Sequence, residues 1–407
     1  MRILILSQYF WPENFRVNDL SSELIARGHE VTVLTGEPNY PDGSIFPAYA
    51  ADPAAFARFE GAPVYRVPII PRGGSSLRLL LNYLSFVVSG LLLGGSRLRG
   101  QEFDAIFVFQ TSPITSAIPA LWLGWRKRAP VLMWVLDLWP ETLSAIGVVK
   151  SRCLLSLVGA MVRMIYKRCD RILVQSRAFY ANVARYAGGD EKILYFPGWP
   201  EPVFSTSGGE PEPAGELAPW QGMFKVMFAG NLGQAQDIPV IIAAADLLRD
   251  EPNLRWIIVG DGRAGADARE EVARRGLEGR VIFAGRYPIE RMPSFFAAAD
   301  ALLVSLRDEP IWSLTIPGKV QSYLASGKPV VAMLNGEGAR VIAESGGGVA
   351  GPAGDAAALA ENVRTLMAMP VERRAEIGQA GRAYCQREFD RAQLVNKLEG
   401  WIEELGN

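Results

Sequence analysis

The first 34 residues carry a strand, a helix and a second strand in close succession. Residues 3–6 are a short apolar run between polar residues, as expected for a strand that is buried on both faces. Residues 18–27 follow a helical pattern that Gly28 ends, and residues 31–34 resemble the next strand. Such a βαβ unit predicts an open parallel sheet that binds ligands at the carboxyl ends of its strands.

The same pattern continues along the chain and restarts once. In the first part, further strands are expected at residues 105–109, 131–135 and 171–174. In the second part, a helix is expected at 239–248 and strands at 225–229, 255–259, 281–284, 301–305 and 329–333. We therefore predict an α/β protein with two doubly wound, Rossmann-like domains, whose parallel sheets face a central cleft.

The length of 407 residues agrees with this division, because single hydrophobic cores rarely grow that large. The expected domains are residues 1–198 and 225–385. Residues 199–224 are rich in Pro and Gly and are interpreted as a linker. Residues 386–407 are expected to form a C-terminal helix, and packing back on the first domain is one option for it.

Composition and charge exclude several classes of protein. Three Cys and one His cannot form a disulfide framework or a four-ligand zinc site, and so few Cys fit the cytoplasm. No signal peptide is recognisable at the start. Residues 1–200 carry 21 Lys and Arg against 15 Asp and Glu, whereas the remaining residues carry 21 against 28. This asymmetry argues against nucleic acid spread over the whole chain and favours an anionic surface or substrate near the first domain.

Residues 77–95 are almost wholly apolar and are flanked by arginines. One interpretation is a buried helix of the first domain, because helices that cover parallel sheets are often this apolar. The alternative is a helix in the membrane surface, with its arginines at anionic head groups. A true membrane span is rejected, because it would separate two parts of one sheet.

Six motifs in order across both halves resemble those of the retaining family 4 glycosyltransferases, and in particular the WbuB-type and WcaI-type group. They are Gln8-Tyr-Phe-Trp-Pro-Glu13, Arg27-Gly-His-Glu-Val-Thr-Val-Leu-Thr35, Asp137-Leu-Trp-Pro-Glu141, Gly230-Asn-Leu-Gly233, Gly285-Arg-Tyr-Pro288 and Ile316-Pro-Gly-Lys-Val-Gln-Ser-Tyr323. The resemblance implies the GT-B fold, with a nucleotide-sugar donor on the second domain and an acceptor on the first. Six ordered motifs carry more weight than any one of them.

The resemblance also implies an activity and its partners. It implies transfer of a sugar with retention, without a metal or other cofactor, and the sequence has no Asp-x-Asp motif that would hold a metal. We expect a UDP-linked donor, with an N-acetylated deoxysugar as one candidate. The implied acceptor is a saccharide on a polyprenyl diphosphate lipid, used for surface polysaccharide such as O-antigen. The enzyme would then lie on the cytoplasmic face of the bacterial plasma membrane.

In the second domain, Lys319 stands at the start of a predicted helix, where a cation opposes the helix dipole. A bound diphosphate would reverse that unfavourable interaction. Thr315 or Ser313 is expected to cap this helix, and Gly318 would let a ligand approach the backbone. Further donor-binding candidates follow predicted strands: Gly230, Asn231, Arg286, Tyr287 and Pro288. A structural turn is the alternative for the last three.

The chain departs from the broader family at this site. Many family 4 enzymes have two glutamates here, one toward the donor sugar and one toward the ribose, and the matching positions are Leu314 and Ser322. Glu309 or Glu337 could replace one of them. The usual Arg and Lys after the first strand of this domain become Asn231 and Gln236. Lys319 and Arg286 are then the expected diphosphate ligands.

In the first domain, Asp137 follows the strand at 131–135 and is the first candidate for a catalytic carboxylate, with Glu141 and Glu13 as further candidates. It would stabilise positive charge at the anomeric centre. Asn14, Arg16 and Trp139 are candidates for acceptor binding, although Trp139 could equally cover the core.

Two other functions can be compared with this one. A dinucleotide oxidoreductase needs a Gly-x-Gly-x-x-Gly loop after its first strand, and residues 7–16 contain no glycine. A non-catalytic GT-B protein that binds a nucleotide sugar or a lipid as a scaffold remains the alternative, because both family glutamates are missing.

Overall fold

The computed structural model describes residues 1–41, 43–73, 75–145, 149, 151–204 and 211–406. They divide into two compact units. The first unit contains residues 1–197 and 391–407, and the second contains residues 198–390.

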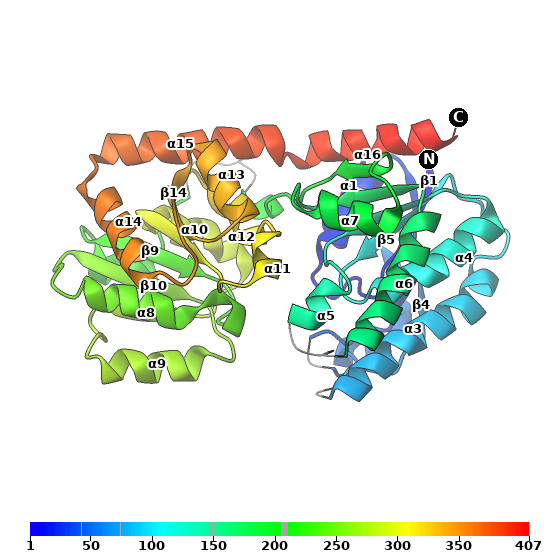
Figure 1. The fold of residues 1–407 in the computed structure, drawn as a ribbon, viewed down its shortest axis with the longest axis horizontal. Coiled ribbons are helices and arrows are strands. Elements are labelled where there is room, and N and C mark those ends of the chain that lie inside the picture. The colour runs from blue at the N-terminus through cyan, green and yellow to red at the C-terminus, as the bar shows by residue number, and fades with distance from the viewer. Residues whose placement is uncertain (42, 74, 146–148, 150, 205–210, 407) are drawn as a thin grey trace. The chain divides into compact units, whose positions relative to one another are not determined.

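The first unit is built on an eight-stranded sheet in the order β3-β4-β2-β1-β5-β6-β7-β8. Figure 1 labels β1, β4 and β5 of this sheet among the helices that surround it. Only β3 and β4 pair antiparallel. The strands are β1 Arg2–Leu6, β2 Glu30–Gly36, β3 Arg58–Phe59, β4 Ala62–Val67, β5 Ala105–Gln110, β6 Val131–Val135, β7 Arg171–Val174 and β8 Ile193–Tyr195. The central strands are buried on both faces, as the apolar runs in the sequence predict.

Helices cover both faces of this sheet. They are α1 Arg16–Ala26, α2 Pro47–Ala51, α3 Ser76–Arg97, α4 Ala117–Lys127, α5 Glu141–Ala145, α6 Arg152–Arg168, α7 Phe179–Ala187 and α16 Arg391–Gly406. Right-handed crossovers place α3, α4, α6 and α7 on one face and α1 on the other. Neighbouring helices of the first group contact one another, and α16 contacts α1.

The C-terminal residues belong to two helices rather than one. Helix α15, Val371–Glu388, ends in the second unit, and α16 packs on the first through four buried apolar residues, Leu394, Val395, Leu398 and Ile402. Glu399 accepts a hydrogen bond of 2.8 Å from Arg27 and contacts His29 Nε2 at 2.6 Å. His29, the only histidine in the sequence, therefore helps to hold α16 on the first unit.

Helix α3 packs on the sheet along one side only. Its buried residues are Asn82, Phe86, Val87, Gly90 and Gly94. Its opposite side exposes six large apolar side chains, which we call the α3 apolar face: Leu77, Leu80, Leu81, Leu84, Val88 and Leu92. Leu92 is 73% exposed, and only 28% of the most apolar stretch of α3 is buried. The interpretation of residues 77–95 as a buried core helix is therefore wrong. By length and composition alone α3 could cross a membrane, but its packed side belongs to the sheet.

The second unit has a six-stranded parallel sheet in the order β11-β10-β9-β12-β13-β14. The strands are β9 Phe224–Ala229, β10 Leu254–Val259, β11 Val281–Gly285, β12 Ala301–Ser305, β13 Val330–Met333 and β14 Gly348–Gly351. The remaining helices are α8 Ile238–Leu247, α9 Gly265–Arg274, α10 Met292–Ala298, α11 Pro310–Ser313, α12 Gly318–Ala325, α13 Glu337–Ser345 and α14 Ala356–Ala368. The predicted pair of parallel, Rossmann-like α/β folds is confirmed.

Two apolar clusters fill the faces of this second sheet. The predicted linker, residues 199–224, contributes to one of them, because Phe204, Ala214 and Leu217 are buried there. Phe204 stacks on Phe296 with ring centroids 5.1 Å apart. The described part of this segment therefore belongs to the second unit, where its apolar residues are buried and its prolines at 202, 211, 213 and 219 are exposed. Residues 205–210 lie outside the described residues.

Candidate functional site

In the second unit, β9 lies between β10 and β12, so the chain direction across the sheet reverses beside β9. Ligands of open α/β sheets bind at such a point, outside the carboxyl ends of the strands. The loops after β9, β10 and β11 form this edge, together with the start of α12. The predicted donor residues Gly230, Asn231, Arg286 and Lys319 all lie in these segments.

Lys319 is the most unusual side chain at this edge. Its Nζ atom is buried and has no hydrogen-bond partner among the residues that the structure describes. The atom lies 3.6 Å from the centroid of the Phe228 ring, and burial lowers the pKa of Lys319 from 10.5 to about 7. Gly230, directly after β9, has a φ of +134°, which favours glycine, and a Cβ there would lie 2.8 Å from Nζ. An anion here would supply the missing partner and restore the charge of the amine.

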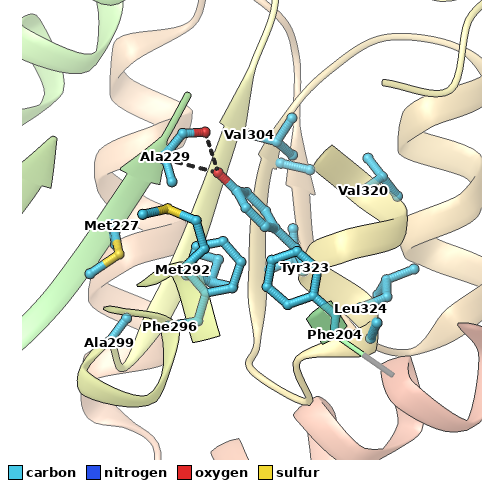
Figure 2. Close-up of a cluster of buried hydrophobic side chains, with 14 of the residues drawn as sticks. Phe204, Met227, Ala229, Met292, Phe296, Ala299, Val304, Val320, Tyr323 and Leu324 are labelled. Carbon is cyan, nitrogen blue, oxygen red and sulfur yellow. Dashed lines mark hydrogen bonds between the residues drawn. The ribbon is translucent and has the colours of Figure 1, made fainter. Parts of the chain in front are cut away.

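A tyrosine fixes the position of Lys319 relative to β9. Figure 2 shows the hydroxyl of Tyr323, on α12, directed at the backbone of Ala229, the last residue of β9. The hydroxyl donates to the carbonyl oxygen at 3.1 Å and accepts from the N–H at 3.0 Å. The ring packs edge-on against Phe296 in the same apolar cluster. The two hydrogen bonds therefore hold α12, which carries Lys319, against the end of β9.

The loops after β9 and β10 lie against each other. A Cβ on Gly260 would lie 2.0 Å from the carbonyl oxygen of Gly230, so this approach needs glycine. Asn231 is exposed, and the Oε1 atom of Gln236 accepts a hydrogen bond of 3.0 Å from the N–H of Gly233. The broader family has cations at these two positions. Here Asn231 is open to a ligand, and Gln236 stabilises the loop.

The start of α12 differs from the prediction. The N-cap is Pro317, and no side chain caps the helix. Thr315 Oγ1 instead donates to the carbonyl oxygen of Trp312 at 2.9 Å, and Ser313 Oγ donates to that of Pro310 at 2.7 Å. The predicted Thr315 or Ser313 cap is therefore wrong, because both hydroxyls bond to α11. A Cβ on Gly318 would meet no atom within 4 Å, so the space before the helix is open.

A carboxylate does lie at one of the two positions where the family glutamates are missing. Ser322 Oγ donates a hydrogen bond to Oε2 of Glu201, which lies in the segment predicted as a linker. Neither of the two expected replacements occupies this place. Glu337 is buried and binds Arg340 with both oxygens at 2.8 Å, and Glu309 is exposed on the loop before α11. Sequence reasoning missed Glu201, because 121 residues separate it from Ser322.

The segment after β11 combines an open arginine with a packed ring. Arg286 is exposed and makes no hydrogen bond or ion pair with the described residues. The ring of Tyr287 lies 4.5 Å from that of Phe295, centroid to centroid, and Pro288 begins a short helical turn. Arg286 is therefore available to a phosphate, whereas Tyr287 and Pro288 hold the turn that carries it.

In the first unit, Asp137 lies just after β6 and is bound to the loop after β5. Its Oδ2 atom accepts a hydrogen bond of 2.8 Å from Ser112 Oγ, which accepts one of 3.2 Å from Trp139 Nε1. Burial raises the pKa of Asp137, and the bond from Ser112 opposes this rise. Trp139 itself is buried, as the core interpretation expects. A half-buried carboxylate with a single donor among the described residues gains from any positive charge that develops beside it.

The two other predicted carboxylates are occupied within the protein. Glu13 accepts hydrogen bonds from the N–H groups of Phe10, Asn39 and Tyr40 at 3.1, 2.8 and 2.7 Å. It is only 2% exposed, and burial raises its pKa to about 7. Glu141 pairs with Arg185. Glu13 therefore joins the loops after β1 and β2, and Glu141 is held by an ion pair, whereas Asp137 has no ion-pair partner among the described residues.

The remaining acceptor candidates lie at the start of α1. Asn14 is exposed, and Arg16 forms an ion pair with Asp19 at 3.4 Å. Both follow β1 as predicted, so they stay at the carboxyl edge of the sheet.

The structure adds an aromatic wall to this edge that the sequence did not suggest. Tyr9, Phe15 and Tyr40 have ring centroids 5.0 to 5.5 Å apart. Arg72 lies over the Tyr40 ring, with its Cζ atom 4.9 Å from the centroid. Tyr83, on α3, has a phenol whose pKa is lowered by the charge of Arg72 and raised by that of Asp137. These residues come from five separate segments, so only the fold brings them together.

Two family models match the chain, one for each unit. The model described as "Glycosyl transferase 4-like domain" matches residues 14–199. The model described as "Glycosyl transferases group 1" matches residues 224–369. The chain is a GT4-type glycosyltransferase.

Similar proteins agree with this assignment. This glycosyltransferase is 26% identical to the putative colanic acid biosynthesis glycosyl transferase WcaI of Escherichia coli K12, over 80% of its own length and 82% of that protein. It is 27% identical to the probable glycosyltransferase WbjE of Pseudomonas aeruginosa, over 67% and 68% of the two chains. The predicted resemblance to the WcaI-type group is thus confirmed.

The fold also matches solved structures. The crystal structure of Anabaena HepE in complex with UDP superimposes with a TM-score of 0.69, at 17% identity, over 99% of this chain and 100% of that one. This likeness confirms the GT-B fold. Among the described residues, no group of three or more His, Cys, Asp and Glu side chains could hold a metal ion.

Proposed function

We propose that this glycosyltransferase transfers a sugar from a UDP-sugar to a lipid-linked saccharide in bacterial surface polysaccharide synthesis. The observation that carries the proposal is the buried Nζ atom of Lys319, which has no partner in the described part of the chain. A protein retains such a group at a cost, unless a ligand pairs with it. The names of the similar WcaI and WbjE enzymes support the polysaccharide, and the UDP complex of HepE supports the nucleotide.

The donor would bind at the carboxyl edge of the second sheet. Lys319 and the free N–H groups at the start of α12 would neutralise the diphosphate, because a helix N-terminus attracts anions. Arg286 would add a second cation from the loop after β11. The carboxylate of Glu201, fixed by Ser322, would accept hydrogen bonds from the ribose hydroxyls. This arrangement replaces one family glutamate from a different part of the chain.

The acceptor would bind at the carboxyl edge of the first sheet, close to Asp137. In a transfer with retention, the donor phosphate itself can accept the proton of the attacking hydroxyl. Asp137 would then stabilise the positive charge that develops at the anomeric carbon. We propose that no metal takes part, since Lys319 and the helix terminus supply the positive charge at the diphosphate.

The α3 apolar face would place the enzyme on the cytoplasmic surface of the plasma membrane. Helices α3, α4 and α6 contain eight Lys and Arg and no Asp or Glu. Exposed apolar residues flanked by cations suit an anionic lipid surface. The protein and its lipid-linked acceptor would then both lie at the membrane surface.

The test combines nucleotide binding with nucleotide release. UDP should raise the melting temperature of the wild type, and Lys319→Ala should weaken UDP binding by about 1.5–3 kcal/mol, the range for hydrogen bonds to charged groups. Arg373→Ala, an exposed residue of α15 far along the chain from this edge, is the matched control. Absence of UDP binding in the wild type would refute the donor site.

Release of UDP from UDP-sugars in the presence of membrane extracts would separate an enzyme from a scaffold. Activity should survive EDTA, and a strict metal requirement would contradict the proposed mechanism. Binding without any release, across a panel of UDP-sugars, would favour the scaffold.

A further inference from the structure

We propose that Arg72 binds the phosphate group of the lipid-linked acceptor, at the point where α3 begins. The inference rests on the proposed function, because it names the part of the acceptor that the first unit would recognise. It assigns a specific role to a residue outside the motifs that identified the family.

The surroundings of Arg72 leave its charge available. The backbone N–H of Arg72 donates to Asn39 Oδ1 at 3.0 Å, which holds the loop after β4 against the loop after β2. The guanidinium lies over the ring of Tyr40 and makes no ion pair or side-chain hydrogen bond with the described residues. Arginine can offer two parallel N–H donors to one phosphate, and stacking on an aromatic ring does not occupy them.

The position of Arg72 relates it to the reacting end of the acceptor. Its guanidinium lies over the ring of Tyr40, which packs against Tyr9 and Phe15 at the carboxyl edge of the first sheet, and Asp137 follows β6 at the same edge. In agreement with this, Arg72 lowers the pKa of the Tyr83 phenol and Asp137 raises it. Arg72 comes from the loop after β4, Tyr83 from α3 and Asp137 from the loop after β6. A sugar hydroxyl beside Asp137 and a phosphate beside Arg72 would then belong to one bound molecule.

The position also relates Arg72 to the lipid end. Helix α3 begins four residues after Arg72, and its exposed apolar face starts at Leu77 and continues with Leu80 and Leu84. Tyr83 lies on the flank of the same helix and is half-buried. The phosphate of a polyprenyl lipid lies at the level of the head groups, and its chain lies in the apolar layer below. At the start of α3, Arg72 can therefore bind the phosphate and the α3 apolar face can bind the polyprenyl chain. A soluble phosphate ester would need only the first of these.

Farnesyl diphosphate is a suitable probe, because it joins a diphosphate to a short isoprenoid chain. Its binding to the full chain would be measured by titration with UDP at saturation, which keeps the probe from the donor site. Arg72→Ala should weaken binding by about tenfold or more, as expected for the loss of a charge-assisted donor. Arg72→Lys, which keeps the charge, should recover part of the loss. Farnesol, which lacks the phosphate, should bind all variants equally.

Arg97→Ala is the matched control, because Arg97 is exposed in the last turn of the same helix, about 30 Å away for a rise of 1.5 Å per residue. This variant makes the same change in net charge and should bind farnesyl diphosphate like the wild type. Equal losses in both variants would show a general charge effect and overturn the inference. Unchanged binding in Arg72→Ala would overturn it as well.

Two further outcomes separate this inference from the function on which it rests. If inorganic pyrophosphate binds as tightly as farnesyl diphosphate at UDP saturation, the site belongs to a soluble phosphate and the lipid assignment is wrong. If the wild type does not bind UDP, the donor proposal fails, and the same titration without UDP still decides the role of Arg72. Circular dichroism and the melting temperature would verify that each variant is folded.

Discussion

Lys319 and Asp137 share a property that ordinary buried charges lack. Among the described residues the Nζ atom of Lys319 has no hydrogen-bond partner and the carboxylate of Asp137 has one, and burial shifts the pKa of each toward the neutral form. Glu13 is also buried, but three backbone N–H groups surround it. Glu13 therefore stabilises loops, whereas Lys319 and Asp137 lack partners that a bound substrate would supply.

The pKa of Lys319 predicts proton uptake on donor binding. In the free protein the amine is neutral above pH 7, because burial has lowered its pKa to about 7. A diphosphate favours the charged form, so the complex binds one more proton than the free protein above that pH. UDP affinity should therefore fall by up to about tenfold for each pH unit above 7. Calorimetry at pH 8 in buffers of different ionisation enthalpy would measure the uptake.

Lys319→Met is the companion variant, since it removes the amine and keeps the length of the side chain. It should bind UDP weakly and show no proton uptake. Without ligand it should melt above the wild type at pH 6, because the wild type holds an unpaired charge there. That difference should shrink as pH rises from 7 toward 10.5, since the folded wild type is already neutral while its unfolded chain still binds the proton. Pairing of Lys319 with a protein group would remove both effects.

Asp137→Asn should lower turnover while leaving UDP affinity unchanged. The substitution keeps the hydrogen bond from Ser112 but removes the charge, so the loss falls on the transition state rather than on ground-state binding. A loss of about 10²–10³ in kcat is expected, comparable to the loss of one preorganised electrostatic partner. Initial rates of UDP release would measure it. Glu141→Gln serves as comparison, and a larger effect there would move the catalytic role to Glu141.

At the scale of elements, apolar runs predicted the strands well. The strands predicted at 131–135, 171–174 and 301–305 have the same bounds in the structure. Strand β4 was not predicted from the sequence, because Pro63 and Arg66 interrupt its apolar pattern. Arg66 is nevertheless buried, where it donates to the carbonyl oxygen of Gly36 at 3.0 Å. A polar side chain that bonds to distant backbone cannot be recognised from its neighbours in sequence.

The sequence predicted one part of the candidate site and missed another. The sequence placed Arg286 and Asp137 at strand ends and Lys319 at a helix start, because parallel sheets bring strand ends to one edge and helix starts attract anions. It could not place Glu201 beside Ser322, nor Arg72 over the ring of Tyr40, because both contacts depend on how separate segments fold. The hydroxyl of Thr315 was assigned to the wrong helix, since a cap depends on local backbone geometry that sequence does not determine.

Helix α16 should be essential to the first unit rather than a tail. Four apolar side chains of α16 are buried, and Glu399 contacts both Arg27 and His29. Leu398→Ala should cost about 2–5 kcal/mol, as for other fully buried leucines. The melting temperature of the intact chain would record the loss. Lys397→Ala, an exposed neighbour on the same helix, should change little, and equal stability of the two variants would show that α16 is dispensable.

At the scale of the whole molecule, the surplus of positive charge in residues 1–200 is concentrated on one helical layer. Helices α3, α4 and α6 supply eight cations, and large apolar side chains stand exposed on each of them. Trp125 at the end of α4 is 80% exposed, and Leu157 on α6 is 67% exposed. Exposed apolar area of this extent ordinarily marks an interaction surface.

Vesicle binding tests whether that surface is a lipid surface. The wild type should sediment with vesicles that contain anionic lipid and be released only in part by high salt, because salt screens the cations but not apolar insertion. Replacing Leu80, Leu84 and Val88 together with serine should reduce binding by at least about tenfold, since one buried CH₂ contributes about 0.8 kcal/mol. UDP binding should persist, because the donor site lies in the other unit. Leu247→Ser, at an exposed leucine of α8, is the control. Since the structure exposes these three side chains, the triple variant should remain folded, and a wild type that ignores anionic vesicles would leave the α3 apolar face to a protein partner instead.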